Sequence, residues 1–383
     1  PAHDSFDGIL LQEWSVQNGL IGPVKNIYSG TSRGLTEAPH LFKRNGYYYL
    51  TTAEGGTGYS HAVSLARSRS IEGPYEDHPD LHVICAADAP DHPIQRTGHG
   101  QYVEAPDGAV YHTFLMGRPL TDASGEGRYC PMGRETGVER CGWRDDWRYL
   151  EAGGLLPRVD VPHSANTPKP QSSIHESFGN TLPIEFQWLR TPHPERLFRL
   201  EAGKLILTGR ESIGSWFEQS LVARRQEHTD YNAQCTLDFR PDIYQQAAGL
   251  TTYYNRFKFH AAMITQTPNE GRVIEIYSCL GDYPEGRLNK ALERPVSIPD
   301  GLIDISVEVR GNLQQFYWSE CGGRRQALGP KLPAYIISDE GGRGEHASFT
   351  GAFVGMLAFD ISGHGKEACF NAFSYIPTQS GDR

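Results

Sequence analysis

The sequence has no long apolar run and no excess of basic residues. No stretch approaches the roughly 18 consecutive apolar residues that a membrane-spanning helix needs, so a membrane partner is not expected. Asp and Glu outnumber Lys and Arg by 46 to 36, which gives a formal net charge of −10 at pH 7. Nucleic acid and anionic membrane surfaces repel such a chain, whereas a neutral sugar is compatible with it.

Several signatures of catalysis and metal binding are also missing. The sequence contains no H-E-x-x-H, no phosphate-binding glycine loop and no set of nucleophile, His and acid. Its cysteines are odd in number, and no two form a C-x-x-C pair, so neither a zinc site nor a disulfide framework is expected. Buried free thiols favour the cytoplasm, although secretion stays open. The seven cysteines are Cys85, Cys130, Cys141, Cys235, Cys279, Cys321 and Cys369.

Turn-forming and aromatic residues, in contrast, are plentiful. The 383 residues include 42 Gly, 25 Pro, 19 Tyr and 16 Phe. Short aromatic-rich runs separated by turn residues predict an all-β protein, and the length allows two domains with a core each. Residues 1–156 show only short strands and loops. Candidate strands there are Ile9–Trp14, Tyr47–Ala53, Ala62–Ser68, Gln101–Glu104 and Val110–Met116.

A change of composition divides the chain. Residues 157–171 carry four prolines among Ser, Asn and Lys, which is typical of a linker. Residues 172–383 then show longer alternating strands, which favour a two-sheet β-sandwich. Candidate strands there are Lys204–Thr208, Ser220–Arg224, Gln234–Phe239, Ala248–Tyr254, Val273–Ser278, Ile303–Arg310 and Gln314–Ser319.

The stretch around Glu37 stands out in the first part. Pro39 disfavours a helical conformation at Ala38 and favours extended backbone there. Asn45-Gly46 before alternating aromatic residues is a strong hairpin signal. We therefore expect Glu37 on an extended segment that leads into a hairpin, beside a glycine-rich loop. Taken alone, it is a surface glutamate near a turn.

Ordered motifs along the chain resemble the glycoside hydrolase family 43 β-xylosidases of the two-domain type, and the resemblance spans nearly all 383 residues. These motifs are Thr-Glu-Ala-Pro-His-Leu (36–41), Gly-Tyr-Tyr-Tyr-Leu (46–50), Ala-Glu-Gly-Gly-Thr-Gly-Tyr-Ser-His-Ala (53–62), Gly-His-Gly (98–100), Gly-Arg-Pro-Leu (117–120), Arg-Tyr-Cys-Pro-Met-Gly-Arg-Glu-Thr (128–136) and Phe-Thr-Gly-Ala-Phe-Val-Gly-Met (349–356).

The resemblance makes the expected fold specific. It implies that residues 1–156 are the C-terminal part of a five-bladed β-propeller, that 157–171 are a linker, and that 172–383 form a concanavalin-A-like β-sandwich, or jelly roll. In the family, the strand that matches Ile9–Trp14 lies about halfway through the propeller. An N-terminal propeller half is therefore expected outside this sequence, in the same protein or a separate chain.

The resemblance also implies the chemistry. The family is inverting, and the Glu of its Thr-Glu-Ala-Pro-His motif is the general acid, which is Glu37 here. The base and an aspartate that modulates the acid belong to the family's N-terminal half. No residue of this sequence matches either one, and Asp4 and Asp7 are not assigned.

Four further residues match positions that bind the sugar. Arg134 matches an Arg that donates forked hydrogen bonds to the sugar in the −1 subsite; otherwise it would be an exposed Arg paired with a neighbouring acid. His99 matches a His at the propeller axis that contacts water or a metal ion. Thr57 would line the pocket, and Phe349 would project toward its entrance, unless it is an ordinary core residue.

These matches predict an exo-acting β-1,4-xylosidase that releases xylose from xylo-oligosaccharides or arabinoxylan fragments, with α-L-arabinofuranosidase activity as a side reaction. The alternative is a catalytically silent, carbohydrate-binding fragment that lacks its base. An endo-acting arabinanase is disfavoured by the match of the sandwich domain. No cofactor is expected to be required, a calcium ion near His99 stays open, and a homo-oligomer is expected. His40 and His61 are expected to be hydrogen-bonded supports.

Overall fold

The computed structural model contains β-strands almost exclusively, which confirms the predicted all-β class. Two short 3-10 helices, η1 (Pro194–Arg196) and η2 (Ala334–Ile336), are the exceptions among the residues described. None of these helices is long and apolar enough to cross a membrane. The structure describes residues 8–122, 124–162, 173–281, 288–342 and 350–378.

The chain divides into two compact units. The first comprises residues 1–119 and 134–166, and the second comprises residues 120–133 and 167–383. Of the expected linker, residues 163–171 lie outside the described part of the chain, as do Asp4, Asp7 and Phe349.

The first unit consists of two four-stranded antiparallel sheets and a separate two-stranded hairpin. One sheet has the order β3-β4-β5-β6 and the other the order β7-β8-β11-β12, so each has the four strands of a propeller blade. The hairpin is β1 (Ile9–Ser15) and β2 (Gly19–Tyr28). The blade strands are β3 (Glu37–Arg44), β4 (Tyr47–Glu54), β5 (Ala62–Ser68), β6 (Glu76–Cys85), β7 (Gln95–Glu104), β8 (Val110–Gly117), β11 (Glu135–Arg144) and β12 (Trp147–Leu150).

Aromatic side chains join the two blades. Phe42 of β3 stacks on Tyr102 of β7, with 4.7 Å between ring centroids, and on Tyr49 at 5.1 Å. Trp143 of β11 meets Tyr49 edge to face at 5.1 Å. Such pairs contribute about 0.5–1.5 kcal/mol each beyond the area they bury. The two blades therefore share one core, and the stack of Phe42 on Tyr102 is one contact between them.

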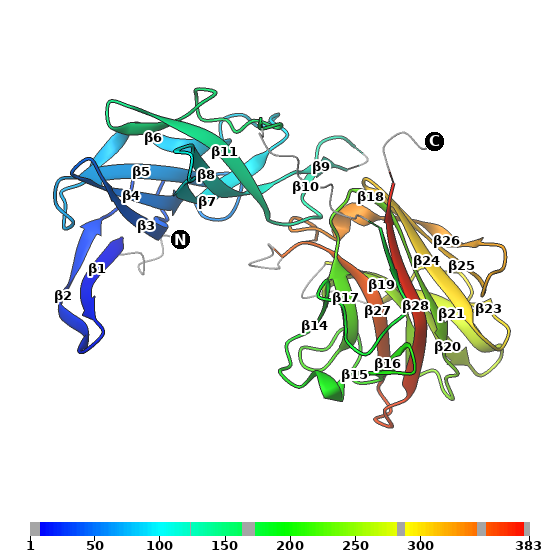
Figure 1. The fold of residues 1–383 in the computed structure, drawn as a ribbon. Coiled ribbons are helices and arrows are strands. Elements are labelled where there is room, and N and C mark those ends of the chain that lie inside the picture. Colours follow the sequence, from blue (N-terminus) through cyan, green and yellow to red (C-terminus); the bar gives the residue numbers. More distant parts are fainter. Residues whose placement is uncertain (1–7, 123, 163–172, 282–287, 343–349, 379–383) are drawn as a thin grey trace. The chain divides into compact units, whose positions relative to one another are not determined.

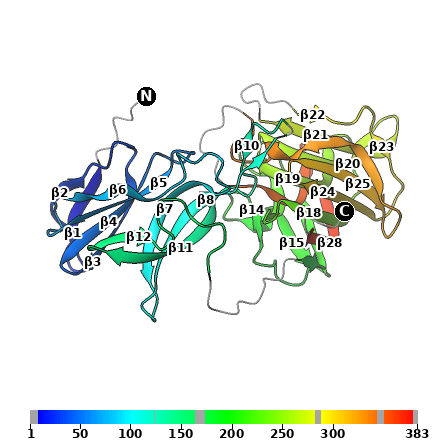
Figure 2. The ribbon, with the colours of Figure 1, turned by 90° about the horizontal axis from the view of Figure 1, so that it is seen from above.

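The second unit is a β-sandwich of two eight-stranded sheets, seen as two layers in Figures 1 and 2. The first sheet runs β15 (Phe198–Glu201), β16 (Lys204–Thr208), β28 (Glu367–Pro377), β18 (Asp230–Asp238), β24 (Ile303–Arg310), β25 (Leu313–Glu320) and β26 (Gln326–Pro333), with β13 (Ile174–Glu176) on β28. The second runs β14 (Phe186–Trp188), β17 (Ser220–Arg225), β27 (Phe353–Asp360), β19 (Gln246–Asn255), β20 (Lys258–Thr267), β21 (Gly271–Leu280) and β22 (Asn289–Lys290), with β23 (Val296–Ser297) on β21.

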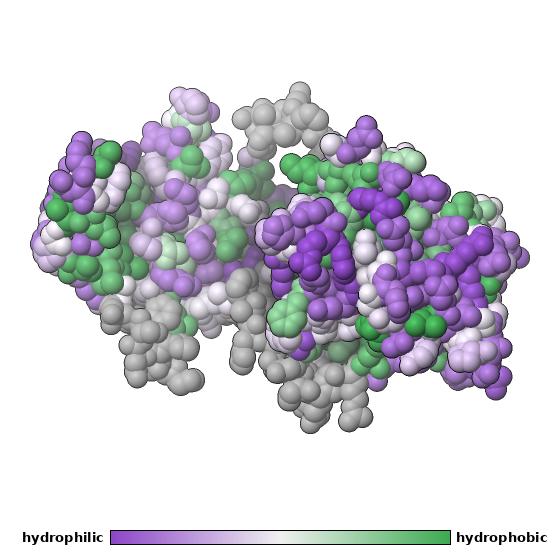
Figure 3. Space-filling view, turned by 90° about the horizontal axis from the view of Figure 1, so that it is seen from below, coloured by the Kyte–Doolittle hydropathy of each residue, from purple (hydrophilic) through white to green (hydrophobic). Residues whose placement is uncertain are grey.

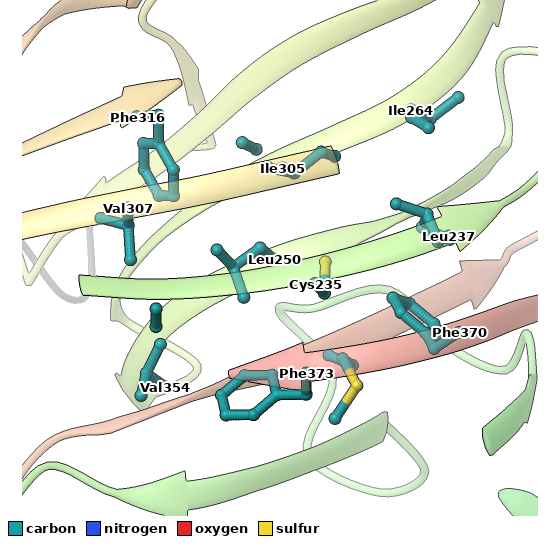
Figure 4. Close-up of a cluster of buried hydrophobic side chains, with 14 of the residues drawn as sticks. Cys235, Leu237, Leu250, Ile264, Ile305, Val307, Phe316, Val354, Phe370 and Phe373 are labelled. Carbon is teal, nitrogen blue, oxygen red and sulfur yellow. The ribbon is translucent and has the colours of Figure 1, made fainter. Parts of the chain in front are cut away.

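Alternating strands fill the space between the sandwich sheets. Along β18, every second side chain is buried, among them Cys235 and Leu237. From the opposite sheet, Leu250 and Val354 reach the same core (Figure 4). Because a period of two places one face of each strand inward, this core follows directly from the sequence pattern. The thiol of Cys235 is one of five buried free thiols, and none of the seven cysteines, all within the described residues, forms a disulfide.

A segment from the middle of the chain packs with the sandwich unit, although it precedes that unit in sequence. It contains the small ladder of β9 (Leu120–Thr121) and β10 (Arg128–Tyr129). The backbone N–H of Cys130 donates to the carboxylate of Glu340 at 2.6 Å, and the N–H of Ala352 donates to the carbonyl of Pro131 at 2.7 Å. The sandwich therefore holds the backbone shortly before Arg134.

Candidate active site

Strands β3 and β7 each form one edge of their sheets. In a propeller, one edge strand of every blade faces the central channel, and the stack of Phe42 on Tyr102 joins a side chain of β3 to one of β7. Glu37 is the first residue of β3, and His99 lies within β7. Two of the residues predicted from the sequence thus lie on strands that face the same axis.

Glu37 is half-buried and pairs with Ala53 at the end of the β3–β4 ladder. Thr36, immediately before it, is buried. No described residue donates a hydrogen bond to the carboxylate of Glu37. The side chain is therefore held at a strand end, where its oxygens can meet a ligand.

The backbone around Glu37 is irregular, which corrects the expectation from Pro39. The φ angle of Ala38 is +52°, in the left-handed region, and that of Leu35 is +54°. The ladder with β4 shifts register between Glu37 and His40. Such a bulge re-aims side chains and occurs often beside active sites. The bulge overrides the local preference that a following proline imposes on Ala38.

The side chain of Arg134 is hydrogen-bonded to a main-chain carbonyl of the glycine-rich loop after β4. Arg134 donates from its NH2 group to the carbonyl of Thr57 at 2.7 Å. Arg96 of β7 donates to the same carbonyl, from NH2 at 3.1 Å and from Nε at 3.3 Å. Thr57 itself is exposed, and its contact with the two guanidinium groups is through the main chain. Sequence reasoning did not identify Arg96.

The acid beside Arg134 has another partner. Glu135 accepts two hydrogen bonds from Arg118, at 2.7 and 3.0 Å. This forked ion pair links the ends of β8 and β11 and lies partly exposed. Glu135 is therefore occupied in a structural pair with Arg118.

The two glycines beside His99 allow close approach of buried rings. A Cβ atom at Gly98 would lie 2.1 Å from Cδ2 of His61, and one at Gly100 would lie 2.2 Å from Nε2 of His112. Both rings are buried, and their nitrogens have no hydrogen-bond partner of normal geometry among the described residues. The Gly-His-Gly motif thus has a steric reason. His61 packs closely against this strand, and its expected role as a hydrogen-bonded support stays a prediction.

Electrostatic effects show which of these groups are neighbours. Burial, then the charges of Arg134 and His99, lower the pKa of His61 to about 3. Burial, then His99, lower the pKa of His40. Because such effects act over short distances, His40, His61, His99 and Arg134 form one cluster in the first unit.

Acid should destabilise the protein through His61. The folded pKa, about 3, lies below the ordinary 6.5, so only the unfolded chain takes up a proton as the pH falls below 6.5. Stability is full above pH 6.5 and is lost progressively down to about pH 3. At pH 5 the loss of unfolding free energy is about 2 kcal/mol for this one group.

Denaturant unfolding at pH 7 and at pH 5 should show this loss. His61→Gln should flatten the pH slope, and Ser64→Ala, which removes a buried hydroxyl that does not titrate, should not. Equal slopes in all three proteins would contradict this prediction.

A buried carboxylate, Glu54, lies behind the loop that leads to Glu37. Thr31 donates to it from its backbone N–H at 2.7 Å and from Oγ1 at 2.5 Å, and Thr36 donates from Oγ1 at 3.0 Å. Burial alone raises the pKa of Glu54, but the contacts with His82 and Thr31 outweigh it and lower the pKa to about 2. The sequence contained this residue in its Ala-Glu-Gly-Gly-Thr motif but gave no sign of the contacts.

A calcium ion near His99 stays a prediction. Among the described residues, no group of three or more His, Cys, Asp or Glu side chains could hold a metal ion. The groups electrostatically linked to His99 are His40 and His61, whereas calcium takes oxygen ligands.

Comparison with known proteins shows which protein families the two parts of the chain match. Residues 1–148 match glycosyl hydrolases family 43, and residues 176–376 match the beta xylosidase C-terminal concanavalin A-like domain. The chain is 46% identical to xylosidase/arabinosidase 43B of Humicola insolens over 98% of this chain and 70% of that protein. It is 38% identical to the beta-xylosidase of Bacillus subtilis strain 168, over 97% of this chain and 71% of that protein.

A solved structure agrees. The xylan beta-1,4-xylosidase of Bacillus halodurans C-125 is 35% identical and superposes with a TM-score of 0.91, over 98% of this chain and 72% of that one. The propeller-type fold and the concanavalin-A-like sandwich predicted from the sequence are thereby confirmed. The chain belongs to glycosyl hydrolases family 43, a family of inverting glycoside hydrolases, and it is a glycosidase with the β-xylosidase type of C-terminal domain.

Proposed function

We propose that this glycosidase is an exo-acting β-1,4-xylosidase that releases xylose from the non-reducing ends of xylo-oligosaccharides and cleaves α-L-arabinofuranosides as a side reaction. The observation that carries the proposal is the position of Glu37, a half-buried carboxylate without a hydrogen-bond donor among the described residues, at the start of an inner strand. The names of the relatives support both pentoside substrates.

Glu37 acts as the general acid in this proposal. It gives its proton to the glycosidic oxygen as the bond to the sugar breaks, while a second carboxylate takes a proton from the attacking water on the opposite face. An inverting enzyme keeps the two carboxyl groups about 6.5–9.5 Å apart so that this water fits. Arg134, held by the carbonyl of Thr57, binds hydroxyl groups of the sugar. His99 lies on β7, and Phe349, which the resemblance suggests for the pocket entrance, lies outside the described residues.

The second carboxylate is not assigned to a residue of this chain. We propose that further propeller strands, in the same protein or a separate chain, supply it. The coverage of the relatives does not by itself support a missing half. The support comes from hairpin β1–β2, which has two strands where a blade has four, and from apolar surface on the first unit (Figure 3). Exposed apolar residues of the hairpin are Leu10, Trp14, Val16, Leu20 and Val24.

Four measurements test this proposal. Intact mass shows whether one chain or two are present in the purified enzyme, and light scattering shows whether it forms the expected homo-oligomer. Digests of xylo-oligosaccharides should release only xylose, and proton NMR should show the inverted anomer first. A robust rate from the 383-residue chain alone would mean that the base is in this chain. Products from mid-chain cleavage would contradict the exo action, and no hydrolysis by any preparation would favour the silent, carbohydrate-binding alternative.

No cofactor takes part in this chemistry. No step of the reaction is assigned to a metal ion.

Arg134→Lys should lower the catalytic efficiency of the enzyme. Lysine keeps the charge but loses the planar fork that hydrogen-bonds a sugar, and a hydrogen bond to a charged group contributes about 1.5–3 kcal/mol. We expect kcat/KM on xylobiose to fall roughly 10- to 100-fold. Arg140→Lys is the control, since Arg140 lies in the same strand region and pairs with Glu151 at 3.6 Å on the surface. Unchanged kinetics in Arg134→Lys would remove Arg134 from the sugar site.

A further inference from the structure

Glu54 lies at the end of β4, fully buried, one residue after the partner of Glu37 in the ladder. Glu37 pairs with Ala53, and successive residues of a strand point to opposite faces of the sheet. Glu54 therefore points away from the face to which Glu37 belongs. It can act on Glu37 through the backbone but not on the sugar.

The carboxylate of Glu54 closes the loop before Glu37 at both of its ends. Its two oxygens accept three hydrogen bonds, two from Thr31 and one from Thr36. Thr36 directly precedes Glu37 and is itself buried. Hydrogen bonds to an ionised acceptor are short and strong, so this loop is held firmly.

The same cluster also holds the glycine-rich loop. Nε2 of His82 lies 3.5 Å from Glu54 and accepts a hydrogen bond from Nε of Arg33 at 3.1 Å. Arg33 donates in turn to the carbonyl of Ser60 at 3.1 Å. The backbone N–H of Gly55 donates to a carbonyl in the first loop at 2.8 Å. Both loops that border Glu37 thus depend on the buried carboxylate.

The backbone near Glu37 needs such support. Leu35 and Ala38, on either side of it, have positive φ angles of 54° and 52°. Residues with a Cβ atom rarely adopt this region, and they stay there only where the surroundings hold them.

We propose that Glu54 is a positioning residue for the reaction: by binding Thr31 and Thr36, it fixes the backbone from which Glu37 delivers its proton. The inference rests on the proposed role of Glu37 as general acid. Glu54 is not the missing base, because its oxygens are occupied by three donors and it points away from Glu37's face of the sheet.

The test is the leaving-group dependence of Glu54→Gln in the full-length enzyme. The amide keeps the shape of the side chain but loses one acceptor and the charge. A displaced proton donor costs about 100-fold, so kcat/KM on a methyl β-xyloside should fall about 10- to 100-fold. On a dinitrophenyl β-xyloside, whose leaving group needs no proton, it should fall less than about threefold, because only proton donation is impaired. A merely structural role would lower both rates by the same factor.

Two further variants keep the test decisive. Thr36→Val removes one hydrogen bond to Glu54 without changing Glu54 itself, so it tests the proposal even if Glu54→Gln fails to fold. It should show a smaller effect of the same kind. Glu76→Gln is the control, since it removes an exposed carboxylate paired with Arg67, and both substrates should be unaffected.

The outcomes separate this inference from the proposed function. Suppose that Glu37→Gln loses activity mainly on the methyl xyloside, while Glu54→Gln and Thr36→Val lower the rates on both substrates equally or leave both unchanged. The positioning role of Glu54 is then refuted and the proposed function stands. If Glu37→Gln loses no more activity on the methyl xyloside than on the dinitrophenyl xyloside, the proposed function fails and the positioning role of Glu54 fails with it.

Discussion

Glu37→Gln should lower kcat/KM on a methyl β-xyloside about 1000-fold and on a dinitrophenyl β-xyloside less than tenfold. A positioned general acid contributes roughly 100- to 10,000-fold, and an alkoxide is too basic to leave without a proton. A dinitrophenolate leaves unaided, so loss of the acid matters little there. The half-buried carboxylate has no described hydrogen-bond donor that would engage it in a structural role. Steady-state kinetics on the two substrates measure the difference.

Glu72→Gln provides the matched control for Glu37. Glu72 is exposed and pairs with Lys25 at 2.6 Å on the outside of the first unit. Its substitution changes the charge by the same amount but should change neither rate. An unchanged rate of Glu37→Gln on the methyl xyloside would refute the acid role.

Strands with a clean pattern were predictable to the residue. Ala62–Ser68, Lys204–Thr208 and Ile303–Arg310 coincide with β5, β16 and β24. Each is bounded by turn residues and carries apolar side chains at the spacing of a strand. Each also pairs with neighbours on both sides, so local pattern and tertiary environment favour the same structure.

Strand β6, at a blade edge, and strand β11, which contains a buried charge, were not predicted. β6 contains Pro79, which suits a strand that pairs on one side only but argues against a strand in the sequence. β11 contains Glu139, which is fully buried and pairs with NH2 of Arg158 at 2.8 Å. Nothing in the local pattern reveals that a residue 19 positions away neutralises this carboxylate.

The candidate site also contains residues that local sequence motifs reveal and residues whose contacts only the folded structure reveals. Glu37 and His99 were singled out as candidates because they lie in ordered motifs. Glu54 and Arg96 were not, because their roles come from contacts between loops and strands that are distant in sequence. The backbone of Ala38 was predicted to be extended, and this was wrong because its φ angle is positive. The register shift at this point arises from the pairing of β3 with β4, which the local sequence does not reveal.

Gly98→Ala should destabilise the protein by about 3 kcal/mol and disturb the site. The new Cβ atom would lie 2.1–2.4 Å from three ring atoms of His61, and overpacking of a core commonly costs about 1–3 kcal/mol. His61 is buried and lies beside Arg134 and His99, so its displacement should also lower activity.

Gly142→Ala is the control. Gly142 also lies within a strand of the same blade and has no positive φ, and no atom lies within 4 Å of the Cβ atom that the substitution adds. Alanine suits a strand better than glycine, so Gly142→Ala should be neutral or slightly stabilising. Denaturant unfolding of both variants measures the contrast, and equal stabilities would show that the ring of His61 is not packed against Gly98.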